Sequence, residues 1–142
     1  MNSENKTLVT NFIKEIWNNI QFEKLHNYIS PHFIDHSLPP DLTPDIDGLK
    51  QWIMLTGKSF EHNTIIEEIV CEENKVMIKI RMYLKHIGAW RSIEATHMII
   101  STIGYRYFKI ADGKITEHWA LIDGNSIENQ LKDAAKGCKI QT

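Results

Sequence analysis

Residues 111–124, ADGKITEHWALIDG, carry charged and aromatic side chains within a stretch that is patterned as a β-strand. The pair Asp112-Gly113 is a hairpin turn signal, and the alternation after it predicts a strand. One side of that strand would hold Ile115, Glu117, Trp119, Leu121 and Asp123. Asp123 then has two interpretations. It caps a following helix, or it ends the strand inside a pocket, where it would act as an acid or base.

Burial would make Asp123 suitable for proton transfer. An apolar wall such as Trp119 disfavours the charged carboxylate and raises its pKa toward neutral pH, where the group can both accept and return a proton. A helix that begins after Asp123 has the opposite effect, because its dipole and free amides favour the charged form. Glu117 lies on the same side but about 20 Å away along a straight strand, so we do not expect a pair of carboxylates.

The histidines give further candidates. His32 and His36 have the four-residue spacing of helical metal ligands, but Pro31 indicates an extended segment, in which they lie about 13 Å apart. We therefore expect no metal site. His86 lies on the apolar face of the strand predicted for residues 75–86. This indicates either a cavity residue or a core histidine bonded to a backbone carbonyl.

Other polar residues are assigned to the outside of the sheet. His118 alternates away from Asp123, so we interpret it as a surface or interface residue. Arg81 and Tyr83 lie opposite His86 on their strand and are interpreted as outer-face residues. No nucleophile motif and no phosphate-binding glycine loop is found, so covalent and nucleotide chemistry are not indicated.

Composition restricts the class of protein. The chain has 142 residues, which suits a single domain over residues 1–142 with its own core. It has 16 basic and 18 acidic residues and no basic run, which gives no footprint for nucleic acid or a membrane surface. Cys71 and Cys138 form no metal or disulfide motif. With no signal peptide or long apolar run, we expect a cytoplasmic protein that needs no cofactor.

Hydrophobic periodicity predicts helices first, then strands, then one closing helix. Helical spacing of apolar residues predicts helices over residues 5–20, 21–29, 45–60 and 126–135. Alternation predicts strands over residues 64–71, 75–86, 95–110 and 114–121. Both faces of the third strand are partly apolar, so its inward face is not determined. A curved antiparallel sheet with helices over one side accommodates these elements, which defines an α+β fold.

Several segments resemble one family: FIDH at 33–36, GLKQW at 48–52, YLKHIG at 83–88 and, most strongly, FKIADGKITEHWALIDGNSIENQL at 108–131. They are similar to the SnoaL-like polyketide cyclases of the nuclear transport factor 2-like superfamily. The resemblance implies a cone, in which a bent antiparallel sheet surrounds a pocket that the N-terminal helices close. It also implies that Asp123 is the general acid and base of a cofactor-free ring closure, and that His36 lines the cavity.

The resulting hypothesis is an enzyme of the cyclase, isomerase or hydrolase kind that moves protons on a small, mostly apolar carbonyl compound. The catalytic candidates are Asp123, His86 and His36. The expected substrate contacts are Trp119, Phe33, Trp52, His97 and Met82. The alternative is a non-catalytic protein that holds a small molecule in the same cavity, because one fold can serve both uses.

The strand over residues 95–110 also predicts a partner chain. An open sheet face carrying Ile99, Ile103, Tyr105 and Tyr107 is expected to be covered. We therefore expect a homodimer formed through the sheet, with no nucleic acid and no membrane among the partners.

Overall fold

The computed structural model describes the backbone of residues 2–140 and the side chains of residues 2–133. In chain order the elements are α1 (Asn2–Phe12), the π-helical segment η1 (Ile13–Asn18), the 3-10 helix η2 (Phe22–Asn27), β1 (Ile29–Asp35), α2 (Ile46–Ser59), β2 (Phe60–Glu72), β3 (Lys75–His86), β4 (Ile99–Ala111), β5 (Lys114–Ile122) and α3 (Gly124–Ile140). The predicted succession of helices, strands and a closing helix is confirmed. β3 has the predicted bounds, whereas β1 was not among the predicted strands.

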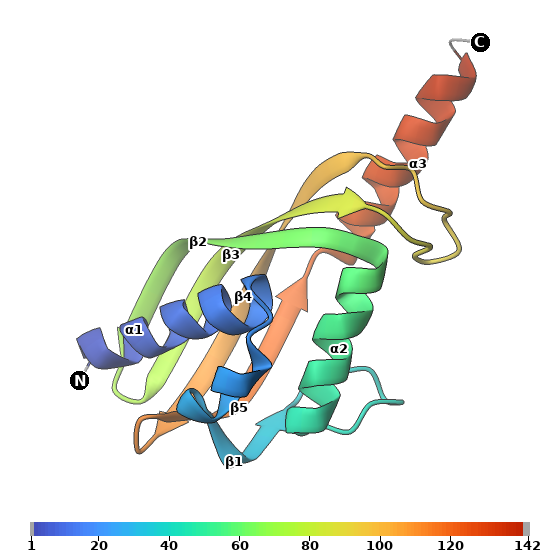
Figure 1. Cartoon of the computed structure of the whole chain (residues 1–142). Helices are drawn as coiled ribbons and strands as arrows, with labels where there is room; N and C mark the ends of the chain where they lie inside the picture. The colour runs from blue at the N-terminus through green and yellow to red at the C-terminus, as the bar shows by residue number, and fades with distance from the viewer. Residues whose placement is uncertain (1, 141–142) are drawn as a thin grey trace.

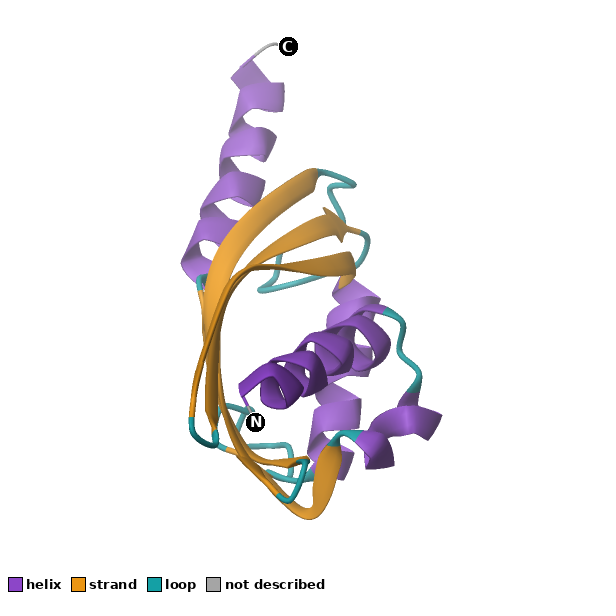
Figure 2. Cartoon of the chain, turned by 90° about the vertical axis from the view of Figure 1, so that its left-hand side faces the viewer, coloured by secondary structure: helices purple, strands orange, loops and turns teal. Residues whose placement is uncertain are grey.

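Five strands form one curved sheet in the order β1-β5-β4-β3-β2. The neighbours from β2 to β5 are antiparallel, as predicted, whereas β1 runs parallel to β5 at one edge. Figures 1 and 2 show the sheet bending around α1, with α2 on the same concave side. The predicted α+β cone is therefore confirmed, with a mixed sheet in place of a purely antiparallel one.

The core lies between the concave face of the sheet and the helices. Alternate residues of β3 point inward, and Ile78, Ile80 and Leu84 are almost completely buried. Ile16 of η1 and Ile53 of α2 belong to the same buried cluster. Burying each of these side chains contributes about 1.5–3 kcal/mol. This apolar layer therefore holds η1 and α2 in place over the sheet.

A β-bulge in β5 changes which of its side chains face the core. Lys109 pairs with Glu117, but the next residue of β4 pairs with Ile115, so Thr116 is an extra residue on β5. An inserted residue shifts the alternation of side chains by one position. Ile115 and His118, three residues apart, are therefore both buried on the concave face.

The sequence prediction for this strand was wrong in two respects. Strict alternation grouped Ile115 with Trp119 and Leu121, whereas the bulge leaves only Ile115 on the concave face and places the other two on the outer face. His118 was interpreted as a surface or interface residue, but only 4% of it is exposed. The cause is local, because a single bulged residue cannot be read from a period of two.

The π-helical segment η1 places Trp17 against the sheet. The next residue, Asn18, bonds in both directions to the backbone of Thr64 in the edge strand β2. Its Nδ2 donates to the carbonyl oxygen at 2.9 Å, and its Oδ1 accepts from the N–H at 2.8 Å. The amide group thus pairs with β2 as a neighbouring strand would. Segments of π-helix often occur at functional sites, and this one fixes the position of a buried tryptophan.

The closing helix α3 follows β5 directly. Asp123 accepts a hydrogen bond from the Ser126 N–H at 3.0 Å, which is the geometry of an N-terminal cap. Ile127 and Leu131 in the first half of α3 are buried, and Figure 1 shows the helix extending away from the sheet beyond them. Of the helices in the described part of the chain, none is long and apolar enough to cross a membrane.

Two glycines of α2 give a matched test of its packing. A Cβ atom at Gly48 would lie 1.6 Å from the carbonyl oxygen of Thr43, whereas a Cβ atom at Gly57 would meet nothing within 4 Å. We expect Gly48→Ala to destabilise the protein by about 1–3 kcal/mol because the backbone must move. Gly57→Ala should stabilise it by about 0.5–1 kcal/mol through helix propensity. Denaturant titration measures both changes, and equal effects of the two substitutions would contradict the packing described.

Candidate functional site

A pocket of about 410 Å³ opens between α2, the sheet, the loop after β3 and the start of α3. Three of the four tryptophans, Trp17, Trp52 and Trp90, line it together with Phe60. Aliphatic side chains, including Met82 and Leu84 of β3, complete the walls. The only charged side chains in the lining, among the described residues, are Arg91 and Arg106. The pocket is therefore an aromatic cavity that carries positive charge.

Arg106 belongs to a chain of hydrogen bonds that runs across three strands. Its Nη1 donates to His118 Nε2 at 3.3 Å, and His118 Nδ1 lies 3.0 Å from Asp35 Oδ2. A guanidinium group has no acceptor, so His118 Nε2 must be unprotonated and its Nδ1 carries the proton that is donated to Asp35. The other oxygen of Asp35 accepts from the Ser37 N–H at 3.0 Å. Asp35 thus fixes the tautomer of His118, and His118 fixes the orientation of Arg106.

All three members of this chain are buried, with exposed fractions of 2% for Asp35 and 4% for His118 and Arg106. Burial lowers the pKa of His118 by more than the hydrogen bond to Asp35 raises it, so the imidazole is neutral. Burial opposes ionisation of Asp35, but the hydrogen bond from His118 and its other contacts bring the net pKa below the usual value. Burial also lowers the pKa of Arg106 to about 10, and the group remains a cation at neutral pH.

Two buried N–H groups at this end of the pocket have no partner among the described residues. They are Nε of Arg106 and Nε1 of Trp17. The guanidinium carbon lies 4.4 Å from the centre of the Trp17 ring, so the two side chains stack in a cation–π contact. Buried donors are normally hydrogen-bonded, and exceptions often mark functional positions. These two donors have no hydrogen-bond acceptor among the described pocket residues, so a bound ligand is the group that would supply one.

Two histidines lie beside the pocket wall. His86 accepts the Thr96 N–H at Nδ1 over 3.1 Å, so its proton is on Nε2, which is buried and has no partner among the described residues. The His86 ring lies 5.3 Å from that of the pocket residue Phe60. His62 packs edge-on to Trp17 at 6.1 Å, and its Nδ1 is likewise buried with no partner in the described part of the chain. Burial and the charge of Arg106 lower the pKa of His62, which keeps it neutral.

The loop after β3 forms the mouth of the pocket. Trp90 and Ile93 pair across a tight turn in which Arg91 and Ser92 both have positive φ, 47° and 63°. Non-glycine residues adopt such angles at a cost, and this strain is typically found at functional loops. Arg91 stacks on the Trp90 ring and lies 3.6 Å from Glu128 of α3.

None of the catalytic residues predicted from the sequence belongs to the described pocket lining, although Asp123 lies between two lining residues, Ile122 and Gly124. Asp123 is exposed and caps α3, which is the geometry of a helix cap, the first of its two interpretations. His36 stacks on Trp119 at 4.3 Å and pairs with Glu117 at 3.0 Å on the outer face of the sheet. His86 is the one predicted catalytic residue that faces the concave side.

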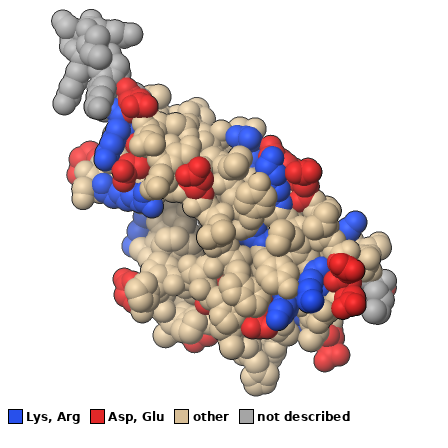
Figure 3. Space-filling view, turned by 180° about the vertical axis from the view of Figure 1, so that it is seen from behind, with Lys and Arg blue, Asp and Glu red and all other residues tan. Residues whose placement is uncertain are grey.

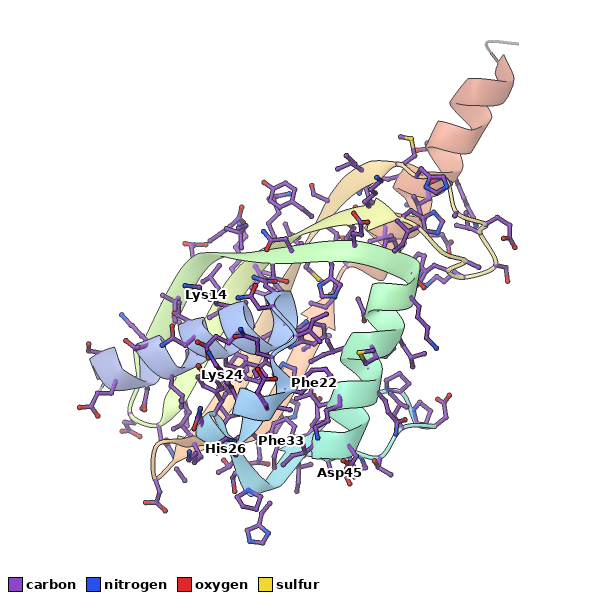
Figure 4. The ribbon with its side chains drawn as sticks, viewed as in Figure 1. Lys14, Phe22, Lys24, His26, Phe33 and Asp45 are labelled. Atoms are coloured by element: carbon purple, nitrogen blue, oxygen red, sulfur yellow. The ribbon has the colours of Figure 1, made fainter. Side chains whose placement is uncertain are left out.

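The predicted substrate contacts divide in the same way. Trp52 and Met82 line the pocket. Trp119 lies on the outer face, and His97 is exposed in the loop with φ of 59°. Phe33 is a buried core residue; Figure 4 labels it on β1 in the lower part of the molecule, near the start of α2. In the described part of the chain, no three histidine, cysteine, aspartate or glutamate residues are grouped so as to hold a metal ion.

Sequence reasoning missed the residues that form the site. Arg106 is the one charged residue in the inward register of β4, whose other members are Ile100, Thr102, Gly104, Phe108 and Ile110. That pattern would have indicated a buried charge if the inward face of β4 had been known. Asp35 belongs to the FIDH segment, in which only Phe33 and His36 were predicted to contribute to the site.

The bent sheet, the concave-side helices and the aromatic pocket between them define a nuclear transport factor 2-like α+β cone. The profile of the SnoaL-like polyketide cyclase family matches residues 7–131, so the chain belongs to that family. Comparison with curated protein sequences gave no match.

Solved structures with this fold confirm the architecture. TsrD from Streptomyces laurentii superimposes with a TM-score of 0.81 at 19% identity, covering 92% of this chain and 96% of that one. IdmH from Streptomyces antibioticus gives 0.81 at 19% identity, with coverage of 90% and 98%. A SnoaL-like polyketide cyclase from Agrobacterium tumefaciens gives 0.76 at 12% identity, with coverage of 89% and 97%. At these identities the likeness establishes the fold alone.

The buried histidine predicts how stability depends on pH. Because the folded-state pKa of His118 lies below its ordinary value of 6.5, the unfolded chain takes up the proton first as the pH falls. Stability should therefore decrease between about pH 7 and pH 5. His118→Gln should make this dependence shallower, whereas a substitution at the exposed His32 should leave it unchanged. Melting temperatures across this range provide the measurement, and an unaltered pH dependence in His118→Gln would count against the assignment.

Proposed function

We propose that the protein is a cyclase or isomerase-type enzyme that transfers protons on a small, mostly apolar carbonyl compound without a cofactor. Membership of the SnoaL-like polyketide cyclase family supports this class of reaction. The observation that carries the proposal is the buried Arg106, held in one orientation by His118 and Asp35 at the wall of an aromatic pocket.

The chemistry follows from the position of this charge. Removing a proton next to a carbonyl group places negative charge on the carbonyl oxygen. A cation held rigidly in a water-poor pocket stabilises that charge without having to reorganise. The chain from Asp35 through His118 supplies the rigidity, since Arg106 is aligned before the ligand arrives. Arg106 is therefore the electrophilic group of the proposed reaction.

The proton that leaves the carbon atom needs a base. The described pocket lining contains no carboxylate and no histidine, so we assign this role to His62, a neutral imidazole that packs against the lining residue Trp17. Its Nδ1 has no hydrogen-bond partner among the described residues. His62 follows the pocket residue Phe60 by two positions and pairs with the pocket residue Leu84. His86, with its proton on Nε2, is the candidate that returns a proton to the substrate.

The second candidate function is non-catalytic binding of a small molecule. It is favoured by the same lack of a carboxylate in the described lining. The family resemblance assigned acid-base work to Asp123, whose side chain caps α3 and is not part of that lining. Both functions use the same cavity. They differ in whether a bound carbonyl compound exchanges its acidic hydrogens.

The two functions are distinguished by the rate at which deuterium from heavy water replaces the acidic hydrogens of enolisable aromatic ketones, measured by NMR. We expect the wild-type protein to accelerate exchange, and Arg106→Gln and His62→Gln each to reduce the acceleration by about 100-fold or more. Asp123→Asn is the control and should retain activity, since asparagine caps a helix about as well as aspartate.

Melting temperatures verify that each variant is folded before its activity is compared. Absence of exchange in the wild-type protein, with a ligand nevertheless bound, would favour the binding function. Loss of exchange in Asp123→Asn alone would restore Asp123 to the mechanism.

We also propose that the outer face of the sheet forms a homodimer. Leu121 and Tyr105 pair across β5 and β4, and they are 80% and 45% exposed. Ile99 and Tyr83 on the same face are also exposed. Figure 3, which views the molecule from behind, shows broad uncharged surface between scattered charged residues. An exposed apolar sheet face of this kind is typical of an interface.

Light scattering tests the dimer. The wild-type protein should have twice the monomer mass at micromolar concentration, and Leu121→Glu should be a folded monomer because a charge would be buried at the interface. Met54→Glu is the control, since Met54 is about equally exposed to Tyr105 but lies on α2, over the opposite face. A monomeric wild-type protein would refute the proposal.

A further inference from the structure

One edge of the Arg106 guanidinium group is free. Nη1 donates to His118, whereas Nε is buried without a partner and Nη2 makes no hydrogen bond to the described residues. Nε and Nη2 lie side by side and point in the same direction, which leaves two parallel N–H donors. This is the pair of donors that binds the two oxygens of a carboxylate group in a bidentate contact. A single ketone oxygen would satisfy one donor and leave the other unmatched.

The charge of the pocket selects for an anion. Its described lining contains Arg106 and Arg91 and no acidic residue. Arg91 at the mouth is already paired with Glu128, so the charge that remains for a ligand is mainly that of Arg106. Asp35 is separated from the guanidinium group by the His118 ring and does not occupy the free edge. A negatively charged ligand end would therefore meet a cation in a low-dielectric site, where the attraction is strong.

The walls of the pocket determine the rest of the ligand. Trp52, Trp90 and Phe60 present aromatic surface, and Trp17 is already stacked under Arg106. Flat aromatic ligands gain most from such walls, because stacked and edge-on ring contacts add to the burial of apolar area. A volume of about 410 Å³ lies within the range of pockets that enclose one small-molecule ligand.

We propose that the pocket binds an aromatic carboxylate, whose two oxygens take the Nε and Nη2 donors of Arg106 while its rings lie among the tryptophans. The inference rests on the proposed function only in using the same pocket. It names the ligand class as an aromatic acid, so a substrate would be an aromatic keto acid.

Calorimetric titration with two probes of similar shape tests the proposal. The naphthoate anion should bind about tenfold or more tightly than the neutral methyl naphthyl ketone, a ratio typical of one charge-assisted hydrogen bond. Equal affinities, or failure of naphthoate to bind at millimolar concentration, would overturn the proposal. This comparison uses the wild-type protein alone and needs no variant that might fold poorly.

Substitution of Arg106 by lysine shows whether the bidentate contact causes the preference for naphthoate over the neutral ketone. Arg106→Lys keeps the positive charge but not the paired donors, so the preference for naphthoate should fall to about a third or less. Arg81→Lys is the control, because Arg81 pairs with Glu67 on the outer face and should leave the preference unchanged. An unchanged preference in a folded Arg106→Lys protein would refute the bidentate contact.

The outcome is separable from that of the proposed enzyme activity. Selective binding of naphthoate without hydrogen exchange into ketones would support the aromatic-acid ligand and count against catalysis. Hydrogen exchange into ketones without any preference for naphthoate would support catalysis and overturn the ligand class.

Discussion

Burial of a guanidinium charge on the concave face of the sheet is the constraint on which the site depends. Taking a charged group out of water is costly unless partners and hydrogen bonds replace the solvent. Three separate parts of the chain meet this requirement at Arg106: His118 from β5, Asp35 from β1 behind it, and the ring of Trp17 from η1. The parallel edge strand β1 and the π-helical segment are thus required by the site as well as by the fold.

The hydrogen bonds of this cluster run in one direction. Arg106 donates to His118, and both His118 and the Ser37 N–H donate to Asp35, so the chain of hydrogen bonds ends on that carboxylate. The unmatched donors, Nε of Arg106 and Nε1 of Trp17, lie at the opposite end, where the pocket begins. The unpartnered N–H donors are therefore gathered at the pocket, which is suited to bind a ligand group that accepts hydrogen bonds.

The elements of the fold were predictable because their hydrophobic periods are clear, as in β3, where every second residue is apolar. Trp52 and Met82 were predictable for the same reason, since each belongs to an inward face of a regular element. The site was not predictable, because it depends on departures from regularity. The bulge at Thr116 reverses the register of His118, and the apolar residues on both sides of β4 conceal which way Arg106 points. Asp35 joins the site only through long-range pairing of β1 with β5.

The pairing of β1 with β5 couples the opening of this sheet edge to the binding of a molecule at Arg106. Asp35 and His118 are 83 positions apart, and contacts of such separation carry a large loop-closure entropy. Edge elements of this kind open more readily than the central antiparallel strands in native-state amide exchange. When β1 detaches, His118 loses the carboxylate that fixes its tautomer, and Arg106 loses its alignment. A molecule bound at Arg106 therefore holds β1 closed by thermodynamic linkage, although no residue of β1 is among those lining the pocket.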